Sequence, residues 1–409
     1  MSLTIPLFDE MQSAATRSVF AALEATGGTG CVRFVGGCVR NALMGRSVSD
    51  LDLSTQLPPE ETETALQAAG IKSVPTGKLF GTITAVVNGT PYEITSLRED
   101  VETDGRRAVV SFTTDWTKDA VRRDFYLNAL YADIDGKIYD PTGQGIVDAH
   151  AGRVRFIGEA EQRIREDYLR ILRFFRFSAG YASEIDVTSF AACVALKDGI
   201  DGLSGERIQQ EVFKTLKLER PIMAFEAMQK GSILSHVIPG WHLTSSGLTE
   251  LARMTELSDD PDRRFLALID GGIGLSIDVL KALQARLKLS QRLYERLHLA
   301  GQVAAQLADL DEALLKRLIY QCGRLATEDA VFLIAAHLGR SPDTLLRHLK
   351  ALNVPAFPLK GADLIARGMT AGPGVGLRLK QIETEWLDHD FSQSVIDRAL
   401  DAVVKTTLN

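Results

Sequence analysis

The feature that most constrains this chain is a change in the spacing of its apolar residues near residue 160. Before that point, short runs alternate with the period of two that is typical of strands: VRFV at 32–35, DLDLS at 50–54, TITAVV at 82–87, YEITS at 92–96 and AVVSF at 108–112. After it, apolar residues recur at three and four spacing, as in 163–178, 206–218 and 279–299. The pattern predicts an α+β chain, with a sheet-bearing first part followed by an all-helical part.

Length and charge limit the classes of function. The 409 residues exceed what one hydrophobic core usually organises, so two to four domains are expected. A net charge of −7 argues against a cationic coat protein for nucleic acids, so any RNA contact must be local. Residues 341–381 carry six Lys or Arg against two acids, a balance of +4, and this segment could meet phosphates.

The cysteines and the N-terminus predict a cytoplasmic protein. The four cysteines form no CxxC pair, so neither a zinc site nor a disulfide framework is indicated. The first residues carry acids where a signal peptide needs a basic region. No apolar run approaches the ~20 residues that cross a bilayer, so no membrane contact is expected.

Two short motifs could handle phosphates and metals. The strand at 32–35 runs into Gly36-Gly37 and then into a helix carrying Arg40; glycines let a backbone approach a phosphate, and a helix N-terminus offers unpaired N–H groups. Asp50 and Asp52 are two apart on an expected strand, so both point to one face, where paired carboxylates suit Mg²⁺. Taken alone, the glycine motif is equally consistent with an ordinary strand-to-helix connection, and the aspartate pair with the solvent-exposed face of a strand.

Together these residues resemble a known family. Gly36-Gly37-Cys38-Val39-Arg40 followed by Asp50-Leu51-Asp52 looks like the signature of nucleotidyltransferases related to DNA polymerase β, in the form found in class II CCA-adding tRNA nucleotidyltransferases and bacterial poly(A) polymerases. Four later motifs continue the resemblance: Arg122-Arg123-Asp124-Phe125 with Asn128-Ala129, Asp140-Pro141 through Gly145 and Asp148, Glu166-Asp167-Tyr168-Leu169-Arg170, and Ser204-Gly205-Glu206-Arg207-Ile208. The chain departs from the family at Phe80, where many relatives carry His, and at Tyr126, where Thr is usual.

The resemblance implies an architecture and a reaction. The expected architecture is a polymerase-β-like catalytic head with a mixed or antiparallel sheet at 1–150, a helical neck that recognises the nucleobase at 151–220, a helical body at 221–340 and a helical, tRNA-binding tail at 341–409. The expected reaction is template-independent addition of CCA to the 3′ end of tRNA from CTP and ATP, with release of pyrophosphate. Neither DNA nor an obligate protein partner is expected.

The resemblance also implies the site residues. Asp50 and Asp52 are expected to hold two Mg²⁺ ions, with Glu93 as a further catalytic carboxylate on the strand after a predicted Asn88-Gly89 hairpin turn. The nucleotide is expected to be bound by Gly36, Gly37, Arg40, Arg122, Arg123, Asp124, Asp167, Arg170, Arg173 and Arg176.

The resemblance further implies that Asp167 and Arg170 read the incoming base. With Arg173 they share one side of the helix expected at 163–177. Cytosine and adenine each present an amino donor beside a ring-nitrogen acceptor, which a carboxylate and a guanidinium match. Guanine and uracil would leave polar groups unpaired, at a cost of about 1–3 kcal/mol for each mismatch. By itself, the charged stripe is also consistent with a solvated, salt-bridged helix face.

The segment between Arg98 and Asp119 bears on which nucleotides the chain can add. In CCA-adding relatives the corresponding flexible loop is needed for the switch from C to A addition. The same residues are also consistent with a hairpin around Asp104-Gly105.

The alternative functions are a poly(A) polymerase on the same head, a partial CC- or A-adding enzyme, and a non-catalytic RNA-binding protein. An antibiotic-modifying type of nucleotidyltransferase would leave more than two hundred helical residues unexplained.

Overall fold

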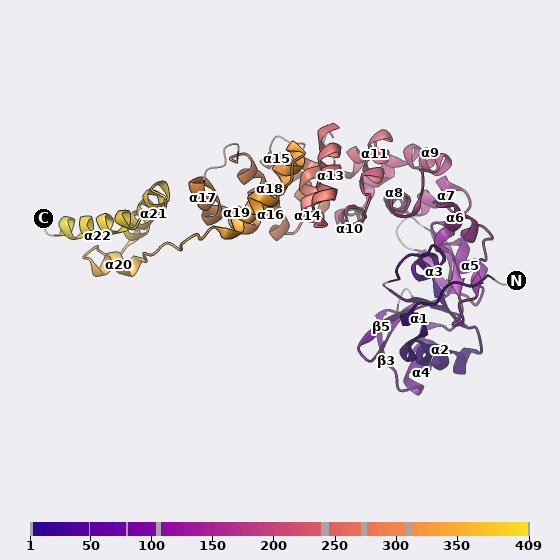
Figure 1. The fold of residues 1–409 in the computed structure, drawn as a ribbon. Coiled ribbons are helices and arrows are strands. Elements are labelled where there is room, and N and C mark those ends of the chain that lie inside the picture. Colours follow the sequence, from indigo (N-terminus) through magenta and orange to yellow (C-terminus); the bar gives the residue numbers. More distant parts are fainter. Residues whose placement is uncertain are drawn as a thin grey trace. The chain divides into compact units, whose positions relative to one another are not determined.

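The chain forms two compact units, Met1–Trp241 and His242–Asn409. The computed structural model describes residues 3–48, 50–78, 81–103, 108–238, 245–270, 276–307 and 312–407, and Figure 1 traces them. None of the helices in these ranges combines the length and the apolar character that crossing a membrane requires. The finer division into head, neck, body and tail stays a prediction.

The first unit holds the predicted sheet. Its seven strands follow the order β3 (Lys72–Gly77), β4 (Thr82–Val87), β5 (Thr90–Ser96), β2 (Asp52–Thr55), β1 (Val32–Val35), β8 (Tyr131–Ala132) and β9 (Ile138–Tyr139). Only the pair β2–β5 is parallel; all the other neighbours are antiparallel. Strands β6 (Arg98–Thr103) and β7 (Ala108–Phe112) form a separate antiparallel pair. The predicted mixed sheet is confirmed.

The turn between β4 and β5 is the one that the sequence predicts. Asn88 has φ 53° and Gly89 has φ 83°, both in the left-handed region that Asn and Gly tolerate. The turn brings Val87 opposite Thr90, so β4 and β5 pair as an antiparallel hairpin. The other predicted turn, Asp104-Gly105, lies outside the described residues, although the strands on either side of it pair with each other.

Helices flank the sheet and continue the first unit. They are α1 (Asp9–Gln12), α2 (Ala14–Gly27), α3 (Gly37–Leu43), α4 (Pro59–Ala68), α5 (Trp116–Val121), η2 (Tyr126–Asn128), α6 (Gly145–Ala151), α7 (Ala160–Glu166), α8 (Leu169–Tyr181), α9 (Val187–Ala195), η3 (Lys197–Gly202), α10 (Gly205–Leu216), α11 (Ile222–Lys230) and α12 (Leu234–Val237). Phe20 of α2 packs on Phe34 of β1, with ring centroids 4.9 Å apart. Phe174 and Phe175 of α8 are fully buried, so this helix carries the core between the sheet-bearing part and the later helices.

The single helix expected at 163–177 is wrong, because α7 ends at Glu166 and α8 begins at Leu169. Asp167 has an extended backbone (φ −157°, ψ 106°), and its carboxylate Oδ1 accepts a hydrogen bond of 3.1 Å from the Leu169 N–H. The ring of Tyr168 lies against Gly199, so closely that a Cβ on Gly199 would be 2.0 Å from it. Contacts with Leu169 at the start of α8 and with Gly199 in η3 therefore accompany the break between α7 and α8.

The second unit is helical throughout its described part. Its helices are α13 (Ser245–Leu257), α14 (Pro261–Asp270), α15 (Ile277–Leu287), α16 (Gln291–Ala304), α17 (Glu312–Cys322), α18 (Arg324–Leu338), α19 (Asp343–Ala351), α20 (Gly361–Ala366), α21 (Pro373–Asp388) and α22 (Gln393–Thr407). The periodic stretch 279–299 is two helices, because the Ser290 hydroxyl accepts a hydrogen bond from the Leu293 N–H and starts α16. One buried cluster includes Leu318, and a separate one includes Trp386.

Candidate active site

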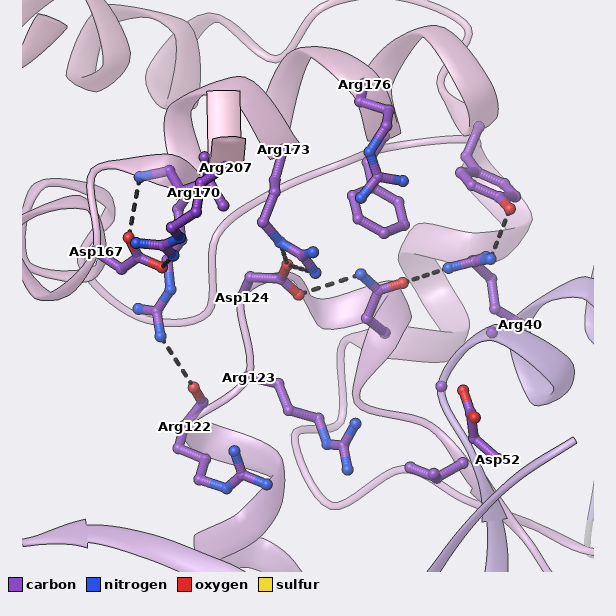
Figure 2. A pocket seen from close by; sticks show the side chains of 17 residues that line it. Arg40, Asp52, Arg122, Arg123, Asp124, Asp167, Arg170, Arg173, Arg176 and Arg207 are labelled. Carbon is purple, nitrogen blue, oxygen red and sulfur yellow. Dashed lines mark hydrogen bonds and ion pairs between the residues drawn. The ribbon is translucent and has the colours of Figure 1, made fainter. Parts of the chain in front are cut away.

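A hollow of about 530 Å³ in the first unit collects the predicted nucleotide-binding residues, and Figure 2 shows its lining. All of them line it: Gly36, Gly37, Arg40, Arg122, Arg123, Asp124, Asp167, Arg170, Arg173 and Arg176. Asp52 lines it too, at the end where β2 begins. The hollow is therefore cationic, with lining arginines from α3, from the segment directly after α5, from α8 and from α10.

Gly36 makes the turn from β1 into α3. Its φ of 66° and ψ of −114° suit glycine alone, and a Cβ there would lie 3.6 Å from the Asn128 carbonyl oxygen. Arg40 is buried and donates to the Asn128 side-chain oxygen at 2.5 Å and to the Tyr181 hydroxyl at 2.6 Å. Burial lowers the pKa of Arg40, and its bonds fix the start of α3 against α8.

The predicted catalytic carboxylates meet at the edge of the hollow. The parallel register of β2 and β5 places Asp52 directly beside Glu93. Asp50 precedes β2 rather than lying on it, and it lines a second hollow, of about 770 Å³, together with Asp52 and Glu93. Asp52 alone of the three lines both hollows.

The electrostatics of this edge favour a cation. The Asp52 residue is exposed, yet partial desolvation, and then the charges of Glu93 and Asp50, raise the pKa of its carboxyl group. Three oxygen-donor side chains on one edge suit a hard divalent ion, which would relieve their repulsion. Among the described residues, no three acidic, His or Cys side chains already stand at metal-binding distances.

Asp124 links the head to α8. Arg173 Nε donates to its carboxylate at 2.7 Å, and Asn128 Nδ2 donates at 3.1 Å. Burial by itself would raise the pKa of Asp124, but Arg173 and Asn128 outweigh it, so the pKa is lowered. Asp124 is therefore an anion that orients Arg173 across the hollow.

Asp167 and Arg170, the predicted base-reading pair, line the same hollow but bind different partners. The Asp167 carboxylate accepts from Arg207 at 2.7 Å, whereas Arg170 donates to Glu166 at 2.5 Å. Arg170 also donates to the carbonyl oxygen of Arg122, at 3.4 Å. Each of the two side chains is therefore held by a neighbour, and Figure 2 shows both of them in the lining of the hollow.

Several residues of the site were not predicted as such. Arg207 and Asn128 line the hollow; both lie in motifs that the resemblance covers, so a signal for them existed. Tyr181 also lines the hollow, and no motif in the sequence around it indicates this. Glu211, which is buried on α10 and accepts from Arg176 Nε at 2.6 Å, was also missed, because its partner is distant in sequence.

Comparisons with known proteins agree on one family. Residues 32–155 match the family model described as the poly A polymerase head domain, and residues 184–243 match the probable RNA and SrmB-binding site of polymerase A. Among solved structures, the CCA-adding enzyme of Bacillus stearothermophilus in complex with CTP has a TM-score of 0.77 at 23% identity, covering 96% of this chain and 98% of that one. The Thermotoga maritima CCA-adding enzyme complexed with tRNA has a TM-score of 0.66 at 20% identity, covering 99% of each chain. These likenesses show the shared fold.

Curated relatives carry the assignment further. Mitochondrial CCA tRNA nucleotidyltransferase 1 of Danio rerio is 32% identical over 376 residues, covering 89% of this chain and 85% of the relative. The Homo sapiens protein of the same name is 32% identical over 388 residues, covering 92% and 87%. A CCA-adding enzyme of Streptococcus pyogenes is 32% identical over 379 residues, covering 88% and 90%. On this similarity along nearly the whole length, the chain belongs to the CCA tRNA nucleotidyltransferase family.

Proposed function

We propose that this chain adds CCA to the 3′ end of tRNA, without a template, from CTP and ATP. The observation that carries the proposal is the single cationic hollow that holds every predicted nucleotide-binding residue and ends at the Asp52 carboxylate. A triphosphate carries several negative charges, and forked guanidinium donors match its oxygens. The printed names of the relatives support the same activity.

Asp167 and Arg170 select the base. The Asp167 carboxylate accepts from the exocyclic amino group of cytosine or adenine, and Arg170 donates to the neighbouring ring nitrogen. Arg207 and Glu166 hold the two readers in place before the nucleotide arrives. Uracil and guanine would set acceptor against acceptor and donor against donor, at a cost of about 1–3 kcal/mol for each unpaired group.

The family's chemistry depends on a divalent metal, and we assign this role to two Mg²⁺ ions at Asp50 and Asp52. Bound there, the ions would lower the pKa of the RNA 3′-hydroxyl and neutralise the departing pyrophosphate. Glu93 adds a third carboxylate through its register with Asp52. Arg122, Arg123 and Arg173 bind and orient the triphosphate, and Gly36 leaves room for it at the turn.

We assign the chain to the cytoplasm. All four cysteines are free thiols, as a reducing compartment would keep them. The vertebrate relatives are named as mitochondrial, so the similarity by itself does not specify the compartment.

The test is incorporation of each labelled nucleotide, singly and in pairs, into tRNA that lacks CCA, in the presence of Mg²⁺ and resolved by length. We expect CC from CTP alone, a terminal A only when ATP is also present, and a stop after three nucleotides. A long A ladder would instead identify a poly(A) polymerase, and a stop at CC with ATP present would identify a partial enzyme. No addition would contradict the proposed activity.

A further inference from the structure

Asp119 on α5 is a buried acid to which the family motifs assign no role. It lies on the helix that ends beside Arg122 and Arg123, and 1% of its surface is exposed. Among the residues that line the nucleotide hollow, Asp119 is absent, whereas both arginines are present. Its carboxylate therefore acts from behind the wall of the site.

The Asp119 carboxylate binds both arginines along the same edge of each guanidinium. Its Oδ1 accepts from Arg122 Nε at 2.9 Å and Nη2 at 2.6 Å, and its Oδ2 accepts from Arg123 Nε at 3.2 Å and Nη2 at 2.8 Å. Tyr131 donates its hydroxyl to Oδ2 at 2.7 Å. Each carboxylate oxygen therefore takes one guanidinium, through charge-assisted hydrogen bonds that are stronger than those between neutral groups.

The opposite edges of the guanidiniums remain available. Within the described part of the chain, neither Nη1 group of the two arginines has a hydrogen-bond partner. The Nη1 of Arg123 lies 3.8 Å from where a Cβ of Gly36 would be, so it faces the turn that starts α3. Figure 2 shows the Arg123 guanidinium between Arg122 and Asp52. A phosphate oxygen seated at the turn would meet this amino group.

Electrostatics explains why one acid serves two arginines. Adjacent guanidiniums repel each other, and an anion between them removes most of that cost. Burial by itself would raise the pKa of Asp119, but Arg123 and Arg122, with the Tyr131 hydroxyl, hold it well below its usual range. Asp119 stays ionised, and the three side chains together keep one net positive charge for a ligand.

We propose that Asp119 is a positioning residue that orients Arg122 and Arg123 toward the triphosphate. This inference rests on the proposed function, since it takes the hollow to be the nucleotide site. Asp119 itself lies outside the hollow, yet it sets the direction of the arginines that bind the triphosphate. The arginines recognise the polyphosphate part of the ligand, whichever base the nucleotide carries.

The same carboxylate also anchors the base of the β6–β7 pair. The N–H of Arg98, the first residue of β6, donates to Asp119 Oδ1 at 3.3 Å, and Arg122 Nε donates to the Arg98 carbonyl oxygen at 3.0 Å. The start of this hairpin and the arginine pair therefore share one anchor. Loss of Asp119 is expected to loosen both.

The experiment measures binding of inorganic tripolyphosphate to the full chain by calorimetry, because this probe has no base and no ribose. The variants are Asp119→Asn and, as a milder change that keeps the carboxylate, Tyr131→Phe. The matched control is Asp329→Asn in the second unit, another buried aspartate held by two arginines, Arg263 and Arg296, each at 2.7 Å.

We expect Asp119→Asn to weaken tripolyphosphate binding by about tenfold or more and Tyr131→Phe by about two- to fivefold, as the loss of orienting hydrogen bonds to charged groups predicts. Asp329→Asn should stay within about twofold of the wild type while it lowers stability. The KM for CTP and for ATP should rise together, with discrimination against UTP and GTP unchanged.

Wild-type affinity in both Asp119→Asn and Tyr131→Phe, or an equal loss in Asp329→Asn, would overturn the positioning role. If Asp119→Asn does not fold, the tripolyphosphate affinity of Tyr131→Phe decides whether Asp119 has the positioning role. If the wild type binds no tripolyphosphate, the triphosphate site itself is wrong. If the variants behave as expected but no nucleotide is added to tRNA, the positioning role stands and the proposed activity fails.

Discussion

At the scale of single residues, six of the arginines that line the hollow are paired with an acid, whereas Arg40 is held by Asn128 and Tyr181. The pairs are Arg173 with Asp124, Arg176 with Glu211, Arg207 with Asp167, Arg170 with Glu166, and both Arg122 and Arg123 with Asp119. Such pairing fixes each guanidinium before the substrate binds, so little reorganisation is needed when charge develops during the reaction.

The carboxylate at the end of the hollow gives the most direct test. Asp52→Asn keeps the shape of the side chain but removes the charge that a metal needs. We expect incorporation into tRNA to fall at least ~100-fold while tRNA affinity stays within about twofold. A filter-binding assay beside the incorporation assay separates the two effects. Activity near that of the wild type would contradict the metal assignment.

Asp119 predicts a specific dependence of stability on pH. Its pKa is lowered in the folded state, so its stabilising effect is present above the unfolded pKa of about 3.9 and is lost as the pH falls toward the folded pKa. Asp119→Asn should therefore cost about 3–5 kcal/mol of the free energy of unfolding at neutral pH.

The difference in the free energy of unfolding between wild type and Asp119→Asn should stay constant from pH 8 to about pH 5 and narrow only below about pH 4. Urea denaturation at several pH values measures it. A difference that already shrinks between pH 7 and pH 5 would show that the carboxylate is not held ionised by its arginines.

At the scale of secondary-structure elements, the break between α7 and α8 decides where Asp167, one of the two residues proposed to read the base, lies. An unbroken helix would carry Asp167 on its surface stripe; the break gives it an extended backbone, and its carboxylate reaches Arg207 of α10. Tyr168 sits in the break because η3 offers a glycine, Gly199, against its ring. The contact between η3 and the break thus sets the direction of Asp167.

Gly199→Ala tests this contact. A Cβ placed 2.0 Å from the Tyr168 ring must displace the ring, at a cost of about 1–3 kcal/mol for overpacking. We expect a lower thermal midpoint and increased incorporation of UTP and GTP relative to CTP and ATP, because a displaced Tyr168 would turn the Asp167 carboxylate away from its present direction.

Gly202→Ala is the matched control, because Gly202 lies in the same short helix and a Cβ there would meet nothing within 4 Å. Its discrimination between bases should equal that of the wild type. If both glycine variants lose discrimination between bases, or if neither does, the contact between Tyr168 and Gly199 does not set the direction of the Asp167 side chain.

At the scale of the whole molecule, positive charge is concentrated in the segment 341–381 of an acidic chain. Its cations include Lys360, Arg367 and Lys380, all exposed on or beside α20 and α21. A protein of net charge −7 binds RNA weakly except where such cations gather. We therefore expect this segment to contribute phosphate contacts to tRNA.

Replacing Lys360, Arg367 and Lys380 by Gln should weaken tRNA binding and reduce the slope of log affinity against log salt by about 2–3. The binding of CTP should not change. The control replaces three exposed cations of the same unit outside the segment, Lys281, Lys288 and Arg292. An equal loss in the control would mean that overall charge, rather than this segment, attracts the tRNA.

The sequence alone predicts the local elements well where the signal is local. Strands 32–35, 82–87 and 108–112 occur with the predicted bounds, and the turn at Asn88-Gly89 has the predicted backbone. Alternation and turn chemistry depend on a few neighbouring residues, so they can be read without the fold. The predicted nucleotide-binding residues also line one hollow, although their roles stay a proposal.

What only the tertiary structure decided is how these residues are paired. Asp124 and Arg173 are 49 positions apart, Arg176 and Glu211 are 35 apart, and the parallel register of β2 and β5 sets Glu93 beside Asp52. The helix break at Asp167 depends on Gly199, and the position of Arg122 and Arg123 depends on Asp119 as a shared partner. The sequence by itself determined the strands, the turn and the set of charged residues; the pairing required the fold, because a buried charge takes whichever partner packing brings within hydrogen-bond distance.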